Sequence, residues 1–155
     1  MKFWDSSALA PLVAEEPTSR QCRDLYRADP AVVVWQFTMT EVVSALTKRS
    51  REDQTFDVPA REAALGRLDR LAAQWEVFDV LTREALLAVR HQARELLLRH
   101  PLKAGDALQL AAATVRFDPP NKRGFVVFDG PLSRAATKEG INVIVLKPER
   151  PRRGR

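Results

Sequence analysis

Segments typical of short buried strands alternate with amphipathic helical segments along most of this chain. The strand-like runs are rich in Val, Phe and Trp and lie at Lys2–Trp4, Val32–Trp35, Trp75–Val80, Phe125–Phe128 and Asn142–Leu146. This alternation predicts a mostly parallel sheet whose crossovers place helices on both faces. We therefore expect an α/β fold, a three-layer α/β/α sandwich with a central sheet of about five strands.

Helical periodicity fills the segments between these strands. It predicts helices over residues 6–15, 18–28, 38–51, 60–74, 83–99 and 106–117. Thr38 and Glu41 have the spacing of a capping box at the start of the third helix. Glu76 and Asp79 interrupt the third apolar run, which indicates a strand at the edge of the sheet.

The 155 residues form no repeat and contain no Gly/Ser-rich linker, so we expect one domain over residues 1–146. The last nine residues, 147–155, hold five of the 25 basic residues and only one of the 20 acids. They are predicted to be a disordered basic tail. Residues 1–146 then carry 20 basic and 19 acidic side chains, which argues against a fold that binds nucleic acid over a whole basic surface.

Cysteine and histidine usage excludes several classes of protein. The single cysteine, Cys22, cannot form an intramolecular disulfide and is expected to be a buried apolar side chain. The N-terminus lacks the apolar core of a signal peptide, and no run of about 18 apolar residues occurs. These features predict a cytoplasmic protein without a membrane span. His91 and His100 are too few for the usual zinc sites, so a metal here would be held by oxygen ligands.

Four acids are placed where a parallel sheet would bring them together. Asp5 and Asp129 each follow a predicted strand, while Glu41 and Asp106 open predicted helices. Ligands of such sheets bind beyond the carboxyl ends of the strands, so the four carboxylates are expected to meet at that edge.

Helix capping is the simpler explanation for each acid taken alone, since Asp and Glu are favoured at helix N-termini. Capping does not explain as well why four acids should be placed together at one edge of the sheet. Two carboxylates about 4 Å apart repel by roughly 4 kcal/mol at an effective dielectric constant of 20, and a divalent cation removes that penalty. Carboxylates without His or Cys suit Mg²⁺ or Mn²⁺, and the chemistry they support is hydrolysis of a phosphodiester. Ser6, beside Asp5, is a candidate to hydrogen-bond a ligand carboxylate.

Four segments in this order and spacing resemble the PIN-domain family, most closely its VapC-type toxin ribonucleases. The segments are Phe3–Leu9, Thr40–Leu46, Leu102–Ala111 and Phe125–Ala136. The resemblance implies a PIN-like nuclease fold that binds Mg²⁺ or Mn²⁺ through Asp5, Glu41, Asp106 and Asp129, with Ser6 at the usual hydroxyl position. It departs from the family pattern at Val127, where relatives often have Thr or Ser, and at Gln109, where many have His.

The resemblance also implies a function and partners. It indicates a metal-dependent endoribonuclease that cleaves single-stranded or loop RNA, forms a homodimer and is silenced by a cognate antitoxin. Two alternatives stay open at this point. One is a stand-alone PIN-like nuclease that processes RNA, and the other is a PIN-like domain that binds RNA or protein without cutting.

Overall fold

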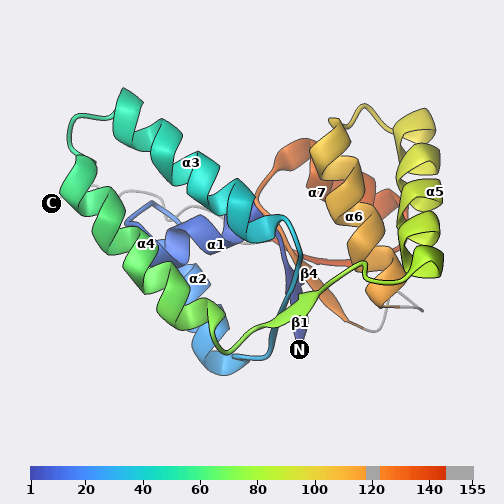
Figure 1. Ribbon diagram of the computed structural model, residues 1–155, viewed down its shortest axis with the longest axis horizontal. Helices are drawn as coiled ribbons and strands as arrows, with labels where there is room; N and C mark the ends of the chain where they lie inside the picture. The colour runs from blue at the N-terminus through green and yellow to red at the C-terminus, as the bar shows by residue number, and fades with distance from the viewer. Residues whose placement is uncertain (118–122, 146–155) are drawn as a thin grey trace, which may run out of the picture.

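A computed structural model describes residues 1–117 and 123–145, and in them a single parallel sheet forms the centre of the molecule (Figure 1). Its strand order is β3-β2-β1-β4-β5. The five strands are β1 (Lys2–Trp4), β2 (Val32–Trp35), β3 (Glu76–Phe78), β4 (Gly124–Val126) and β5 (Asn142–Ile144). The chain builds outward from β1 to β3 and then returns to place β4 on the other side of β1. The topological switch point therefore lies between β1 and β4, where α/β sheets bind their ligands.

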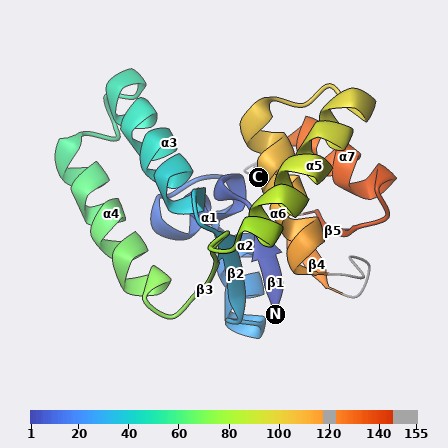
Figure 2. The ribbon, with the colours of Figure 1, turned by 45° about the vertical axis from the view of Figure 1, so that its right-hand side comes forward.

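Helices cover both faces of this sheet and complete the predicted three layers (Figures 1 and 2). One layer contains α1 (Ser6–Val13), α2 (Ser19–Ala28), α3 (Thr38–Glu52) and α4 (Val58–Ala72). The other contains α5 (Arg83–Arg99), α6 (Ala104–Arg116) and α7 (Gly130–Lys138). The fold class expected from the sequence is confirmed, and β3 is an edge strand, as Glu76 and Asp79 in the apolar run Trp75–Val80 predicted.

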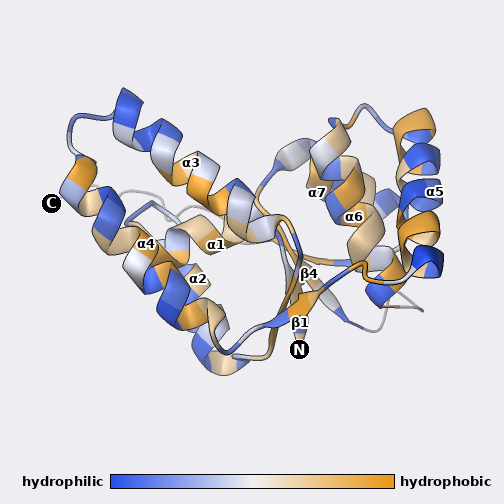
Figure 3. Ribbon diagram, in the orientation of Figure 1, coloured by the Kyte–Doolittle hydropathy of each residue, from blue (hydrophilic) through white to orange (hydrophobic). Residues whose placement is uncertain are grey.

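The central strand β1 divides the core between the two layers because successive side chains of a strand point to opposite faces. Phe3 is fully buried on the side of α5–α7, where it meets Phe117 and Phe125 edge to face. Trp4 is fully buried on the other side, against Tyr26 of α2. Within the layer of α5–α7, Figure 3 shows α6 as mostly hydrophobic and α5 as carrying both hydrophilic and hydrophobic residues.

Some of the remaining sequence predictions can be compared with the structure, and others concern residues that it does not describe. Cys22 is buried, as expected of an apolar cysteine. None of the helices in residues 1–117 and 123–145 is long and apolar enough to cross a membrane. The predicted strand residue Leu146 and the basic tail at 147–155 lie outside the described residues.

Candidate metal-binding site

Asp5 and Asp129 lie on either side of the switch point, each at the N-cap of a helix. Asp5 Oδ2 accepts a hydrogen bond from the Ser7 backbone N–H at 2.9 Å, and Asp129 Oδ1 accepts one from the Leu132 N–H at 2.8 Å. The Asp5 N–H donates to the carbonyl of Val126 at 2.9 Å, which extends the β1–β4 pairing one residue past the end of β1. Both acids are therefore caps, as the simpler explanation predicted, and both stand at the edge where a ligand would bind.

Ser7 supports this pair of acids, a role that the sequence analysis did not find. Its hydroxyl donates to Asp5 Oδ2, and its Oγ accepts a hydrogen bond from the Phe128 N–H at 3.0 Å. Phe128 directly precedes Asp129, so one hydroxyl joins the two segments that carry Asp5 and Asp129. Its position after Asp-Ser was the only available signal, and a serine there is equally at home in the first turn of any helix.

Glu41 and Asp106 belong to the first turns of α3 and α6, and here the capping predictions were wrong. The N-cap of α3 is Phe37, which makes no side-chain cap, so Glu41 does not complete a capping box. The N-cap of α6 is Lys103; Asp106 lies three residues further on and its carboxylate accepts from the Lys103 backbone N–H. An acid in the first turn is still favoured by the helix dipole.

Glu41 lies close to the start of α6. A Cβ atom on Gly105 would stand 3.7 Å from Glu41 Oε1, so Glu41 approaches the residue next to Asp106. The Ser6 side chain hydrogen-bonds the Glu41 carboxylate. Ser6 therefore contacts one of the four acids, which is the type of contact expected for it, although that acid is Glu41 rather than its neighbour Asp5.

A buried polar bridge holds the elements that carry these acids. Thr38 accepts from the Trp35 N–H at 3.2 Å and its hydroxyl donates to Gln109 Oε1 at 3.3 Å. The Gln109 amide in turn donates to the carbonyl of Trp4 at 3.5 Å. Thr38 opens the helix of Glu41, Gln109 lies one turn after Asp106, and Trp4 precedes Asp5. The amide of Gln109 is buried because it bonds both Thr38 and the Trp4 carbonyl. Thr38 is not available as a helix cap because its hydroxyl takes part in the same bridge.

Burial and repulsion from neighbouring acids raise the pKa values of Asp5, Glu41 and Asp106. Burial, followed by repulsion from Asp106 and Asp129, raises the pKa of Asp5. Burial and repulsion from Asp5 and Asp106 raise the pKa of Glu41 to about 7. Burial and then Asp129 raise the pKa of Asp106. The structure therefore brings all four carboxylates into one electrostatically coupled group, as the sequence predicted.

The donor set of this group fits a hard divalent cation, although the acids do not form a finished cage. Within the residues that the structure describes, no three His, Cys, Asp or Glu side chains converge closely enough to hold a metal by themselves. Mg²⁺ is commonly bound through one or two carboxylates and retains several waters, so it does not need such a cage. Coupled carboxylates with raised pKa values are the environment in which a cation relieves repulsion.

Glu41 gives the metal-free protein an unusual dependence of stability on pH. A pKa of about 7 in the folded state, above the ordinary 4.5, means that the folded state binds more protons than the unfolded state between these pH values. We expect the free energy of unfolding to fall as pH rises through this window. Glu41→Gln should raise it at pH 8 by about 1–2 kcal/mol and flatten the pH profile.

Urea unfolding in chelator at pH 5.5 and pH 8 measures this effect. Glu52→Gln, at the exposed other end of α3, is the matched control and should keep the wild-type profile. Parallel profiles for Glu41→Gln and the wild type would contradict the electrostatic description of the site.

Comparison with known proteins places the chain in a family. The family model that describes the PIN domain matches residues 2–118, which include Asp5, Glu41 and Asp106 and end before Asp129. This chain belongs to the PIN-domain family. No curated protein gives a significant match.

Solved structures with a similar fold include proteins described as toxins or toxin–antitoxin complexes. VapBC2 from Rickettsia felis, solved bound to a DNA fragment from its promoter, is 10% identical with a TM-score of 0.63, over 94% of this chain and 98% of that chain. VapC20 from Mycobacterium tuberculosis, described as a toxin that cleaves the sarcin-ricin loop, is 23% identical with a TM-score of 0.61, over 87% and 95%. FitAcB from Neisseria gonorrhoeae is 14% identical with a TM-score of 0.62, over 96% and 98%.

Proposed function

We propose that this PIN-domain protein is a Mg²⁺- or Mn²⁺-dependent endoribonuclease that cleaves single-stranded or loop RNA. The observation that carries the proposal is the coupling of Asp5, Glu41, Asp106 and Asp129 at the topological switch point of the sheet. Mutually repelling carboxylates at a ligand-binding edge destabilise the folded protein when no cation is bound. In a metal site the same carboxylates bind the cation.

Each residue has a part in the proposed chemistry. A bound divalent cation supplies Lewis-acid activation of water and neutralises charge on the phosphodiester. The four acids would hold that cation. Ser6 would orient the Glu41 carboxylate. Ser7 would fix the position of Asp5 relative to Asp129, because its hydroxyl bonds both Asp5 and the backbone of Phe128. Preorganisation of this kind lowers the cost of arranging the ligands when substrate binds.

The proposed biological role is that of the toxin in a toxin–antitoxin pair, with a cognate antitoxin as its partner. Support comes from the fold neighbours, which include a toxin–antitoxin complex from Klebsiella pneumoniae as well as VapBC2. A homodimer and a cytoplasmic location are further parts of this proposal. Growth arrest on expression of the chain alone, relieved by the product of a neighbouring short reading frame, would support the toxin role over a stand-alone nuclease.

Removal and return of metal tests the enzymatic part. We expect the purified protein to cleave a single-stranded RNA oligonucleotide with Mg²⁺ or Mn²⁺ and to lose that activity in EDTA. Mn²⁺ at about 100 times its Kd should also stabilise the fold by roughly 2.7 kcal/mol. Cleavage that persists in EDTA would contradict the metal mechanism. Absence of both cleavage and stabilisation would favour a PIN-like binding module without catalysis.

A further inference from the structure

A cavity of about 620 Å³ opens directly beside the acidic group, between α1, the turn after it and α3. Its volume falls within the roughly 300–1,000 Å³ typical of sites for small molecules. Ser6 and Asp129 line the side that belongs to the candidate metal site. Glu16, Thr18 and Phe128 also line the cavity and have no part in the chemistry described above.

Glu16 is a carboxylate held in place with its hydrogen-bonding capacity largely unused. Its backbone N–H donates to Ser19 Oγ at 2.9 Å and its carbonyl accepts from the Ser19 N–H at 3.0 Å, so the turn is well defined. Glu16 Oε1 faces Arg49 Nη1 at 3.7 Å, beyond a direct hydrogen bond. Among residues 1–117 and 123–145, no side chain donates a hydrogen bond to this carboxylate. The Glu16 side chain is 33% exposed and lines the cavity, so its carboxylate can meet a ligand there.

The charge of the cavity decides which part of a nucleic acid it can accept. Two acidic residues, Glu16 and Asp129, line the cavity, and Arg49 lies beside the first of them. A phosphate group would be repelled there. A neutral group that donates hydrogen bonds to carboxylate oxygens is favoured, and the half-buried ring of Phe128 adds aromatic surface against which a planar group can pack.

We propose that this cavity binds the nucleobase adjacent to the scissile phosphate and that Glu16 selects guanine. Guanine presents an N–H and an amino group side by side on its Watson–Crick edge, which matches the two acceptor oxygens of one carboxylate. Recognition of unstacked bases through that edge, combined with aromatic packing, is the usual way in which proteins distinguish single-stranded RNA sequences. The inference rests on the proposed nuclease function and names the substrate preference of the same site.

The test compares oligoadenylate RNAs that contain a single guanosine, inosine or cytidine at one position. Inosine keeps the ring N–H of guanosine and lacks its amino group. We expect the wild type to cleave next to guanosine on the order of 10-fold faster than next to inosine or adenosine. Glu16→Gln replaces one acceptor oxygen by a donor and should remove this preference, so that the rates of cleavage next to guanosine and next to adenosine become similar.

Two further variants separate base selection from folding. Glu15→Gln alters the adjacent carboxyl, which is 77% exposed and pairs with Arg23, and should keep the preference for guanosine. Glu16→Asp keeps the negative charge toward Arg49 but withdraws the carboxylate from the cavity, so it should lose the preference and remain folded. A wild type without base preference, or a Glu16→Gln variant that retains it, would overturn the proposal. If the cavity instead binds a basic side chain of a protein partner, Glu16→Gln should retain the base preference of the wild type.

Binding measurements distinguish this inference from the proposed function. Fluorescence anisotropy with Asp106→Asn and with Asp106→Asn/Glu16→Gln measures selection of the guanosine oligonucleotide without cleavage. If the wild type fails to cleave but the single variant still selects guanosine and the double variant does not, the base pocket stands and the nuclease proposal fails. If the wild type cleaves but neither variant selects guanosine, the pocket proposal fails and the nuclease proposal stands.

Discussion

Replacing Asp106 with Asn should reduce metal-dependent RNA cleavage by more than 100-fold while leaving the fold intact. Changes to groups that only support metal ligands typically cost about 10–100-fold, and loss of a ligand charge should exceed that range. Asn keeps the size of Asp and can still accept the hydrogen bond from the Lys103 N–H. Burial and the charge of Asp129 raise the pKa of Asp106. Removing the charge of Asp106 should therefore also relieve electrostatic repulsion and stabilise the metal-free protein.

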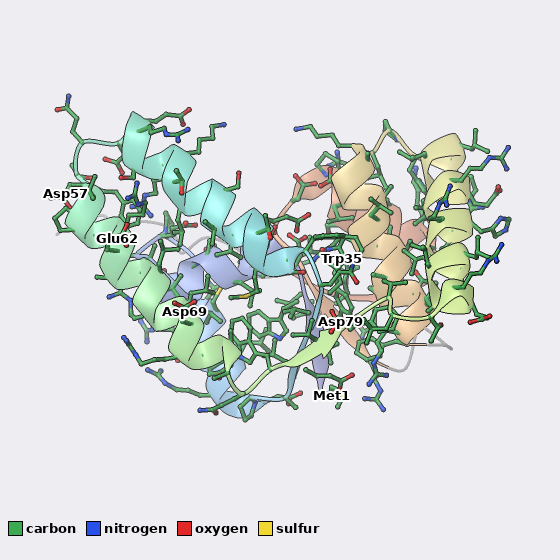
Figure 4. The ribbon with its side chains drawn as sticks, in the orientation of Figure 1. Met1, Trp35, Asp57, Glu62, Asp69 and Asp79 are labelled. Atoms are coloured by element: carbon green, nitrogen blue, oxygen red, sulfur yellow. The ribbon has the colours of Figure 1, made fainter. Side chains whose placement is uncertain are left out.

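Cleavage assays together with thermal unfolding measure both parts of this prediction. The control is Asp69→Asn, which changes an exposed carboxyl on α4, where Figure 4 labels it. That variant should cleave RNA at the wild-type rate. Undiminished cleavage by purified Asp106→Asn, with contaminating nuclease excluded, would contradict the proposed mechanism.

Phe3→Ala should damage the fold strongly, with a loss of about 3–5 kcal/mol in the free energy of unfolding. Phe3 is fully buried in the central strand, with ring centroids 6.0 Å from Phe117 and 5.9 Å from Phe125. Its removal leaves a cavity between β1, β4 and the end of α6. Because whole domains are stable by only ~5–15 kcal/mol, a measurable fraction of the variant should be unfolded.

Urea unfolding of three variants tests whether packing is the cause. Phe3→Leu retains most of the volume and should lose less than Phe3→Ala. Phe37→Ala removes a ring that is 50% exposed and should cost little. Equal losses for Phe3→Ala and Phe37→Ala would show that burial of Phe3 in the central strand does not control stability.

The agreement between sequence and structure is closest where signals are local. The helix over residues 83–99 matches α5 residue for residue, because an apolar stripe with period 3.6 is written into the sequence itself. Agreement fails where a contact between distant residues competes with a local preference. Thr38 and Glu41 have the spacing of a capping box, yet Thr38 is buried and bonds Gln109, which is 71 positions away in the chain. A buried hydroxyl must find a partner, and that requirement overrides the weaker preference for a cap.

The sequence alone determined the layer architecture, the edge position of β3 and the acids that would meet at one end of the sheet. These follow from periodicity and from the rule that parallel strands end at a common edge. Only the tertiary structure decided that Ser7 joins Asp5 to the segment of Asp129, that Ser6 serves Glu41, and that Glu16 lines a cavity beside them. Such contacts join residues that are distant in sequence, and their partners are chosen by how the layers pack rather than by any local pattern.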